Sequence, residues 1–346
     1  MMSESNSVQN RNQMPPSMAM LQMISGTWVA QAIYVAAKLG IADLLKDSPK
    51  SSQKLAEATG VDARSLYRVL RALASIGVFA EGEDNCFHLT PLAACLQTGV
   101  PDSVRNIAIM YGEAFNWQPW GNIFHSVKTG KTAFGHVFGM EFFEYLTQNP
   151  EAGKIFDGAM TDFTTTLTAN ITADYDFSSF RKIVDVAGGQ GGLISSILKA
   201  HPTMQGVLFD LPQVIENAKA FIEAQGVTSR CELVGGNFFE SVPSGGDAYI
   251  MKSIIHDWDD EKAIAILKNC HKAMVENGKL LLVEMVIGPG NQTSLGKFID
   301  LAMLVMAGGC ERTETEYRAL FEASGFRLTN IFNTQSPMNI IEGVRV

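Results

Sequence analysis

The chain has 346 residues, 46% of them hydrophobic and 18% charged, with a formal net charge of −9 at pH 7. This length exceeds the usual size of a single domain, so we expect two domains. The negative charge repels nucleic-acid backbones and anionic lipid surfaces, which leaves a small molecule as the expected binding partner.

The first segment, residues 1–17, is polar and ends near two prolines, so we expect a disordered tail. It lacks a basic start followed by an apolar run, and no later segment has about 18 uninterrupted apolar residues. We therefore expect no signal peptide, no membrane span and a cytoplasmic location. The five cysteines are widely spaced without a Cys-x-x-Cys pair, which indicates reduced thiols and no metal site.

Residues 18–100 begin with a helical pattern from Met18 to Leu45 that is apolar on several faces and needs a partner surface, so we expect a homodimer. Two further helices separated by Gly60 and a short hairpin near residues 81–85 follow in a winged-helix pattern. Between Ile41 and Thr90 six basic residues face seven acidic ones, a net charge of −1, which argues against DNA binding. We predict a winged-helix-like dimerisation domain.

Residues 101–176 are predicted to be helical and to form a linker and substrate lid. The segment is rich in aromatic residues, most of which we expect in the core and a few around a planar ligand. These aromatic residues are Tyr111, Phe115, Trp117, Trp120, Phe124, Phe134, Phe138, Phe142, Phe143, Tyr145 and Phe163.

Residues 177–346 alternate short apolar runs with helical stretches, which predicts a doubly wound, mostly parallel α/β sheet. The last two runs, "FRLTNIF" and "MNIIEGVRV", are too close for a crossover helix and should form an antiparallel hairpin at the sheet edge. The small-molecule site should lie at the carboxyl ends of the strands.

A glycine-rich turn, "VDVAGGQGG", joins the first strand of this sheet to its helix. Gly188, Gly189 and Gly191 allow a ligand to approach the backbone, whereas Ile194 stands where a dinucleotide fingerprint needs its third glycine. Asp210 ends the second strand, where a carboxylate can bind both hydroxyls of a ribose. With Asp185 near the turn for a cationic group, this pattern favours S-adenosylmethionine as the cofactor.

Six motifs, the glycine-rich turn among them, follow one another along the chain: "VDVAGGQGG", "FDLP", "GGNFFESVP", "MKSIIHDWDDEKAIAILKNCHKAM", "NGKLLLVEMVI" and "GGCERTETEYRALFEASGF". In their order and spacing, and over nearly its whole length, the chain resembles the caffeate-type S-adenosylmethionine-dependent O-methyltransferases, which include plant phenolic, animal hydroxyindole and bacterial antibiotic-pathway enzymes. The resemblance implies a class I methyltransferase fold, a homodimer and methyl transfer to a hydroxyl of a small aromatic or polyketide-like acceptor in secondary metabolism.

The resemblance also implies cofactor residues, namely Gly188, Gly189 and Gly191 of the turn, Asp210, Asn237, Phe238 and Lys252. The predicted cofactor site further includes Asp185 and Leu211. Two positions depart from the family pattern. Ala187 replaces a common glycine, and Asn237 replaces a common aspartate that accepts a hydrogen bond from the adenine amino group. An asparagine keeps an acceptor oxygen, so we expect binding to persist with altered strength.

His256 follows the fourth strand of the sheet, and Glu284 lies near the end of the fifth, so both should reach the same edge. A histidine here can be a core or helix-capping residue. The resemblance instead implies a general base, oriented by Glu284 and Glu311, which requires a neutral imidazole. The following acids, Asp257, Asp259 and Asp260, are expected to cap the next helix.

The acceptor pocket is implied only by the resemblance, which matches Met160, Met303 and Met306 to apolar pocket positions. With 16 methionines in the chain, each of them can equally be structural. Two other functions stay open: N-methylation of a heteroaromatic ring, which needs no base, and a winged-helix regulator that senses S-adenosylmethionine. Retention of the histidine with both acids favours O-methylation.

Overall fold

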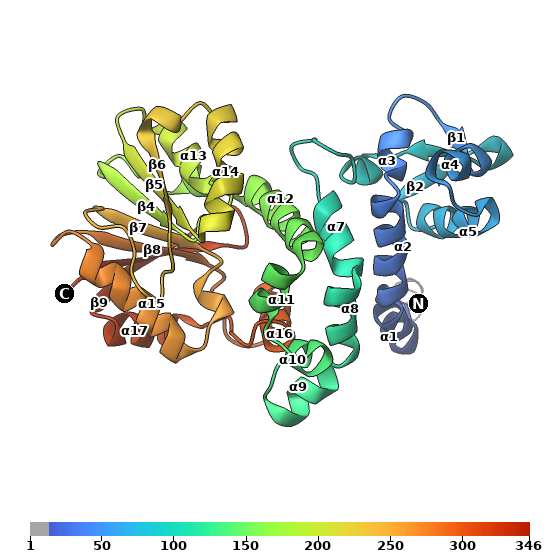
Figure 1. The fold of residues 1–346 in the computed structure, drawn as a ribbon. Helices are drawn as coiled ribbons and strands as arrows, with labels where there is room; N and C mark the ends of the chain where they lie inside the picture. The colour runs from blue at the N-terminus through green and yellow to red at the C-terminus, as the bar shows by residue number, and fades with distance from the viewer. Residues whose placement is uncertain (1–13) are drawn as a thin grey trace, which may run out of the picture. The chain divides into compact units, whose positions relative to one another are not determined.

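The computed structural model describes residues 14–346, with the backbone alone for residues 164–170. The predicted disordered tail lies largely outside the described residues, and its last two residues belong to helix α1 (Pro16–Ile24). The chain divides into two compact units, Met1–Gly112 and Glu113–Val346, so the boundary falls inside the expected linker of residues 101–176. Figure 1 shows the course of the chain.

The first unit contains a small antiparallel sheet surrounded by helices. Its strand order is β1-β3-β2, and the side chains of Ser51 and Asp62 cap the two helices of the winged-helix pattern, α4 and α5. Leu66, Leu70 and Leu73 of α5 face the core of the unit. After α1 the elements are α2 (Gly26–Lys38), α3 (Ile41–Leu44), β1 (Lys50–Ser51), α4 (Ser52–Thr59), α5 (Ala63–Ala74), β2 (Phe79–Glu81), η1 (Glu83–Asn85), β3 (Cys86–Leu89), α6 (Pro91–Ala94) and α7 (Arg105–Gly112).

The second unit begins with five helices that contain most of the aromatic residues noted above. Phe134 is fully buried and contacts the rings of Phe138, Phe142 and Tyr145 with centroid distances of 4.7 to 5.4 Å. Edge-to-face and tilted pairs of this kind stabilise a core. The helices are α8 (Ala114–Gly121), α9 (Ile123–Thr129), α10 (Ala133–Phe138), α11 (Phe142–Gln148) and α12 (Pro150–Asp174).

The remainder of the second unit is a seven-stranded sheet in the order β6-β5-β4-β7-β8-β10-β9. Strands β4 to β8 pair in parallel, and β10 pairs antiparallel with both β8 and β9. The predicted α/β fold with an antiparallel edge hairpin is therefore confirmed. The strands are β4 (Lys182–Val186), β5 (Gln205–Asp210), β6 (Cys231–Gly235), β7 (Ala248–Lys252), β8 (Lys279–Glu284), β9 (Phe326–Asn333) and β10 (Asn339–Arg345).

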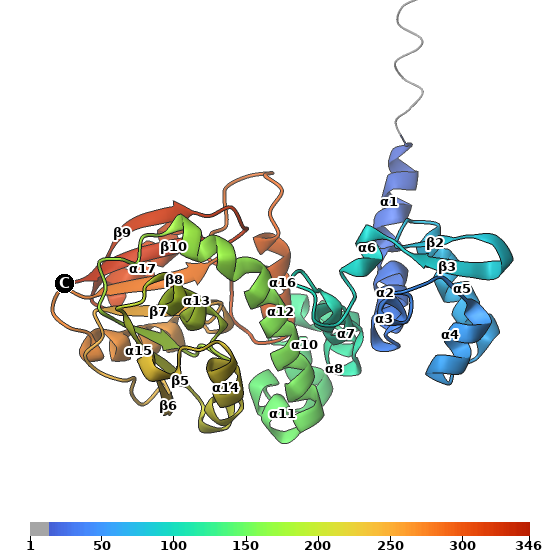
Figure 2. The ribbon, with the colours of Figure 1, turned by 90° about the horizontal axis from the view of Figure 1, so that it is seen from above.

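Helices cover both faces of the sheet, as Figure 2 shows from above. One hydrophobic core joins the sheet to α12, α13 and α14, and a second core joins its other face to α15 and α17. The connecting elements are α13 (Gly192–Ala200), α14 (Pro212–Ala224), η2 (Thr228–Arg230), η3 (Ile255–Asp257), α15 (Asp260–Ala273), α16 (Gly296–Val305) and α17 (Glu314–Ala323). Within the described residues, the helices are too short or too polar to cross a bilayer.

Candidate active site

The glycine-rich turn follows β4 and bends the backbone into a conformation that side chains disfavour. Ala187, Gly189 and Gly191 have φ angles of 57°, 59° and 83°, in the left-handed region. A Cβ atom on Gly188 would lie 2.5 Å from Leu208 Cδ1 and 2.6 Å from Asp185 Cγ, so only glycine fits there. A Cβ on Gly189 would meet nothing within 4 Å, which leaves open space beside the turn.

Two aspartates lie against this turn. Asp210 accepts hydrogen bonds from the main-chain nitrogens of Gly189 at 2.9 Å and Leu211 at 2.7 Å. Asp185 is 1% exposed, and its Oδ2 atom has no hydrogen-bond partner among the described residues. Burial raises the pKa of Asp185 to about 7, although the nearby Lys252 ammonium acts to lower it. A cationic ligand group placed here would stabilise the ionised form of Asp185.

The other expected cofactor residues follow the neighbouring strands β5, β6 and β7. Leu211 is 42% exposed directly after Asp210. Asn237 Oδ1 accepts a hydrogen bond from Phe239 N at 3.0 Å, so one lone pair of this oxygen is already used within the loop. Phe238 packs edge-on against Trp258, with ring centroids 5.9 Å apart. Lys252 ends β7, and burial lowers the pKa of its ammonium.

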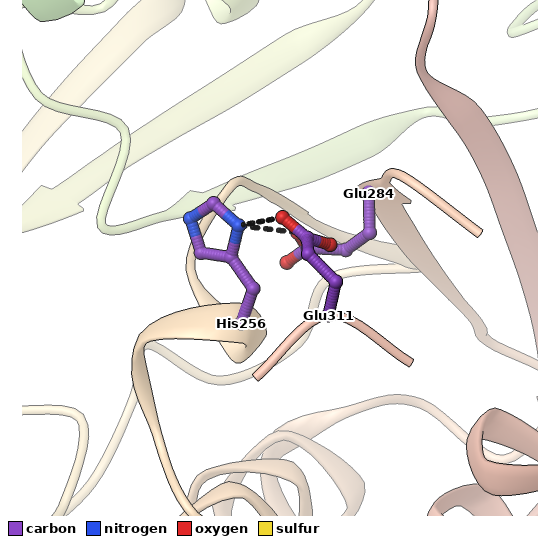
Figure 3. A group of neighbouring side chains, drawn as sticks. All are labelled: His256, Glu284 and Glu311. Atoms are coloured by element: carbon purple, nitrogen blue, oxygen red, sulfur yellow. Dashed lines mark hydrogen bonds and ion pairs between the residues drawn. The ribbon is translucent and has the colours of Figure 1, made fainter. Parts of the chain in front are cut away.

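His256 lies in the short helix η3, close to two buried carboxylates (Figure 3). Its Nδ1 atom is 2.7 Å from Glu311 Oε1, a hydrogen bond, and 3.6 Å from Glu284 Oε2. The Nε2 atom is 3.6 Å from Asp257 Oδ1. The three predicted catalytic side chains are thus brought together, and Glu311 is the one that contacts the ring directly.

Glu284 lies beside His256 as expected and has a second set of contacts. Its Oε1 atom accepts hydrogen bonds from the main-chain nitrogens of Ile254 at 3.0 Å and Ile255 at 2.8 Å, the residues that lead into His256. The carboxylate of Glu284 therefore holds the backbone of the turn, while its Oε2 atom has no hydrogen-bond partner among the described residues.

The carboxylates determine the charge of the histidine. Burial alone lowers the pKa of His256, but Glu284, Asp257 and Glu311 together outweigh it and raise that pKa to about 10. Burial raises the pKa of Glu284 to about 7 and that of Asp257 to about 6. The carboxylates therefore favour the protonated imidazole in the protein alone, whereas a general base must be neutral when it accepts its proton.

The same three side chains, His256, Glu284 and Glu311, have the donor types of a metal site. One nitrogen and two carboxylate oxygens lie within 4.8 Å of one another. The 2.7 Å separation of Nδ1 and Oε1 is a hydrogen-bond distance. The carboxylates thus act as hydrogen-bond and charge partners of the imidazole.

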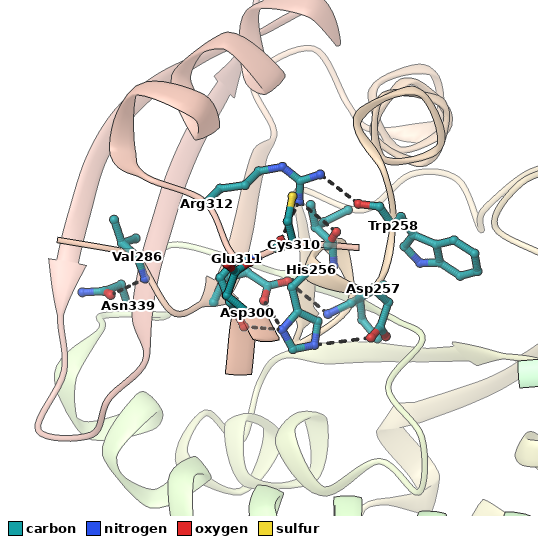
Figure 4. A network of polar contacts seen from close by, with 12 residues as sticks. His256, Asp257, Trp258, Val286, Asp300, Cys310, Glu311, Arg312 and Asn339 are labelled. Atoms are coloured by element: carbon teal, nitrogen blue, oxygen red, sulfur yellow. Dashed lines mark hydrogen bonds and ion pairs between the residues drawn. The ribbon is translucent and has the colours of Figure 1, made fainter. Parts of the chain in front are cut away.

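The structure assigns new roles to several residues near this site (Figure 4). Asp259 caps α15 as expected, through a hydrogen bond from Lys262 N. Asp260 stands in the first turn of α15, where it complements the helix dipole as expected, and it also forms an ion pair with Arg312 at 2.8 Å. Asp257 instead faces His256. The sequence did not indicate a role for Arg312, because an arginine next to other charged residues along the chain gives no sign that it is buried.

The three methionines predicted to line the acceptor pocket are all partly or fully buried. Met160 lies on α12, Met303 lies on α16, and Met306 follows the last turn of α16 with 5% exposure. Met303 and Met306 precede the segment that carries Glu311.

A glycine turn after β4, an aspartate at the end of β5 and a histidine after β7 lie at one edge of the sheet, an arrangement typical of the class I methyltransferase fold. Residues 21–99 match the family model of an O-methyltransferase dimerisation domain, and residues 120–327 match that of an O-methyltransferase domain. The chain belongs to this O-methyltransferase family.

Curated relatives and solved structures agree with this assignment. The chain is 48% identical over 328 residues to the phenazine O-methyltransferase PhzM of Lysobacter antibioticus, covering 95% of this chain and 96% of the relative. It is 30% identical to the phenazine-1-carboxylate N-methyltransferase of Pseudomonas aeruginosa, covering 97% of this chain and 99% of that relative. The solved structure of LaPhzM superimposes with a TM-score of 0.94 at 47% identity, covering 96% of this chain and all of that one.

The cofactor follows from a further structure. The O-methyltransferase NcsB1, solved with S-adenosylmethionine and 2-hydroxy-5-methyl naphthoic acid, matches with a TM-score of 0.80 at 30% identity, covering 92% of this chain and 96% of that one. The chain is a methyltransferase that uses S-adenosylmethionine. The geometry of the chain fits this cofactor in two ways. The buried Oδ2 atom of Asp185 has no hydrogen-bond partner among the described residues and would be satisfied by a cationic ligand group, and the open space beside Gly189 has room for a ligand.

Proposed function

We propose that this methyltransferase acts on a hydroxyl group of a planar aromatic natural product, with His256 as the general base. The 2.7 Å hydrogen bond between His256 Nδ1 and Glu311 Oε1 carries this proposal, because it fixes one ring nitrogen and orients the other. Nε2 lies at an ion-pair distance of 3.6 Å from Asp257 Oδ1, beyond a normal hydrogen bond, so a hydrogen bond from Nε2 to the acceptor oxygen is still possible.

The acceptor class is supported by the relatives. The Lysobacter relative, at 48% identity, is a phenazine O-methyltransferase. We therefore propose a hydroxylated phenazine or a fused aromatic of similar size as the acceptor of this chain. Met160, Met303 and Met306 would supply apolar contacts to its rings, since thioether side chains adapt to flat aromatic surfaces.

The cofactor residues act mainly by positioning. When bound, S-adenosylmethionine supplies an electrophilic methyl group on a positively charged sulfur. Asp210 would bind the ribose hydroxyls, Asn237 and Phe238 the adenine, and Asp185 with the glycine turn the amino-acid end. Holding two reactants in line can contribute about 7 to 11 kcal/mol, more than a general base usually contributes.

The base acts in one step with methyl transfer. The acceptor O–H bond breaks and its proton moves to His256 Nε2, while the oxygen forms a bond to the methyl carbon and the carbon–sulfur bond breaks. Glu311 accepts the hydrogen bond from Nδ1 and stabilises the imidazolium that results. A histidine whose pKa is about 10 matches the pKa of an ordinary phenol, also about 10, so proton transfer is close to balanced.

This match has a consequence at neutral pH. Because the carboxylates raise the pKa of His256 to about 10, the protonated imidazole predominates at pH 7. An acceptor that is already ionised has no proton to lose and would meet the protonated ring directly. We therefore propose that acceptors with acidic hydroxyls are the better substrates at neutral pH.

Product analysis tests the proposal. The enzyme is incubated with methyl-labelled S-adenosylmethionine and a panel of hydroxyphenazines, simple phenols and nitrogen heterocycles. Mass spectrometry detects the methylated product, and NMR locates the methyl group. We expect O-methylated phenazines. Methylation only at ring nitrogen would contradict the proposal.

N-methylation of a heteroaromatic ring is the second candidate, favoured by the similarity to the Pseudomonas N-methyltransferase at 30% identity. A ring nitrogen attacks through its lone pair and needs no base. His256→Ala should then leave most of the activity, whereas O-methylation of a weakly acidic hydroxyl should be lost.

We also propose a homodimer located in the cytoplasm, with no nucleic-acid or membrane partner. The dimerisation-domain match spans residues 21–99, and helices α1 and α2 expose large apolar side chains in the chain alone. These include Met18, Leu21, Met23, Ile24 and Trp28, with exposures of 52% to 77%. Multi-angle light scattering should give twice the mass of the 37.6 kDa chain at micromolar concentration. A monomer at that concentration would contradict this assembly.

A further inference from the structure

Arg312 directly follows Glu311 and is fully buried, with 1% exposure. Its guanidinium binds the turn that carries His256. Nη1 donates to the carbonyl of Ile255 at 3.1 Å, and Nη2 donates to the carbonyl of Trp258 at 2.8 Å. These two carbonyls stand immediately before and after the pair His256–Asp257, so one side chain holds both ends of the catalytic turn (Figure 4).

The charge of this arginine is balanced outside the active site. Nε and Nη2 donate to Asp260 Oδ1 at 3.0 and 2.8 Å, and Nη1 also reaches the carbonyl of Cys310 at 3.3 Å. Asp260 is largely exposed, with 74% of its side chain accessible. A buried guanidinium with several directed donors is a rigid bridge, unlike the single flexible ammonium of a lysine.

The backbone of the same segment is anchored independently. The Arg312 carbonyl accepts a hydrogen bond from Ile287 N at 3.0 Å, and Glu311 N donates to Asp300 Oδ1 at 2.9 Å. These hydrogen bonds fix the backbone position of Glu311, while the guanidinium of Arg312 fixes the position of the His256 turn.

Gly309 limits the turn from a further direction. A Cβ atom on Gly309 would lie 2.0 Å from the carbonyl oxygen of His256 and 2.6 Å from Trp258 N, so the two backbones touch. The turn therefore has contacts of three kinds: Glu284 binds its main-chain N–H groups, Arg312 binds its carbonyls, and Gly309 packs against its backbone.

We propose that Arg312 is a positioning residue that sets the distance between His256 and Glu311 by joining the His256 turn to the segment that carries Glu311. A merely structural arginine would stabilise the fold without changing this distance. The kinetic part of the inference rests on the proposed role of His256, while the geometric part concerns the His256–Glu311 contact alone.

The test is the variant Arg312→Lys, which keeps a positive charge but cannot bind Ile255, Trp258 and Asp260 together. Because the hydrogen bond to Glu311 favours the protonated ring, a longer contact should lower the pKa of His256 by at least about one unit. NMR titration of imidazole-labelled protein measures this pKa, and comparison with His256→Ala identifies the signal among six histidines. Turnover of a weakly acidic phenol should fall about 10- to 100-fold, with cofactor affinity within about twofold of wild type.

Arg230→Lys is a matched control. Arg230 also binds main-chain carbonyls, those of Leu198, His201 and Met204, at 2.9 to 3.2 Å. It precedes β6 and therefore lies at the opposite, amino-terminal edge of the sheet. Arg230→Lys should lower the melting temperature without changing the pKa of His256 or the turnover number.

Asp260→Asn provides a second variant in case Arg312→Lys does not fold. The exposed asparagine keeps an acceptor oxygen but removes the charge that holds the guanidinium. We expect a smaller fall in the pKa of His256 and a turnover about 2- to 5-fold lower.

The geometric and kinetic claims fail separately. An unchanged pKa of His256 in Arg312→Lys, or in Asp260→Asn if the lysine variant does not fold, would overturn the positioning role even if O-methylation stands. A lowered pKa would support that role even if the product proves to be N-methylated, in which case the proposed function fails alone.

Discussion

The glycine-rich turn and the His256 turn lie at the same edge of one sheet, but different forces hold them. The glycine turn depends on backbone shape, with left-handed φ angles at three positions and no room for a Cβ atom on Gly188. The His256 turn depends on buried charge, since Glu284 and Arg312 bind it from 29 to 57 residues further along the chain. The first turn should therefore be sensitive to added volume and the second to altered charge.

The largest effect on turnover should come from removing the imidazole of His256. His256→Ala should lower turnover of a phenol with a pKa near 10 by about 100-fold or more, with cofactor affinity nearly unchanged. The loss should be under about 10-fold for an acceptor that is ionised at assay pH. Steady-state kinetics with both acceptors measures this, and His201→Ala, before β5 at the opposite edge of the sheet, is the control. Equal losses on both acceptors would show that His256 is structural.

In the glycine-rich turn, the corresponding change is to add a side-chain atom to Gly188. Gly188→Ala places a Cβ atom 2.5 Å from Leu208 and 2.6 Å from Asp185, so the turn must move away from the carboxylate. We expect the dissociation constant of S-adenosylmethionine to rise at least about tenfold in calorimetry. Gly121→Ala, at a position with nothing within 4 Å, should have no effect on binding. Wild-type affinity in Gly188→Ala would disprove the steric account.

Asp185 combines the features of the two turns, because it is a buried ionisable group that packs against the glycine-rich turn. Its pKa of about 7 is raised above that of an unfolded aspartate, so the folded state binds this proton more tightly. The resulting stability is complete below about pH 4 and is lost as pH rises through 7. In Asp185→Asn, the fall in unfolding free energy between pH 5 and 8 should be smaller by about 1 to 3 kcal/mol. Denaturant titrations of the cofactor-free protein measure this; an unchanged fall would mean that Asp185 ionises normally.

The smallest effect concerns backbone strain at Ala187. An alanine at φ 57° costs about 1 to 2 kcal/mol, part of which is offset by the greater freedom of an unfolded glycine. Ala187→Gly should raise the unfolding free energy by up to about 1 kcal/mol. Ala220→Gly, in the exposed face of α14, should lower it by a similar amount. A destabilised Ala187→Gly would show that the alanine methyl group has a packing role.

The two turns also differed in how far the sequence predicted them. The strands, the glycine turn and Asp210 follow local spacing and hydrophobic runs, which a sequence shows directly. The pairing of His256 with Glu311 came only from a family resemblance, because 55 residues separate them. Neither the sequence pattern nor the resemblance indicated the burial of Arg312 or the turning of Asp257 toward His256. The pKa of His256 depends on three carboxylates at once, so it could be obtained only from the folded structure.

The dependence of kcat/KM on pH for two acceptors tests the central claim, that His256 is the general base, most directly. For a phenol with a pKa near 10, the wild-type enzyme should become about tenfold faster per pH unit between pH 7 and 9, because neutral His256 becomes more abundant. For an acceptor with a pKa near 6, the rate should be constant over the same range, since the phenolate and the protonated imidazole are both present throughout. Attack by phenolate without a base would give the same two profiles, so His256→Ala is measured beside the wild type. The account predicts that the variant is slower by about 100-fold or more on the weakly acidic phenol and by less than about tenfold on the acidic acceptor, and equal losses on both acceptors would contradict the role of His256 as the base.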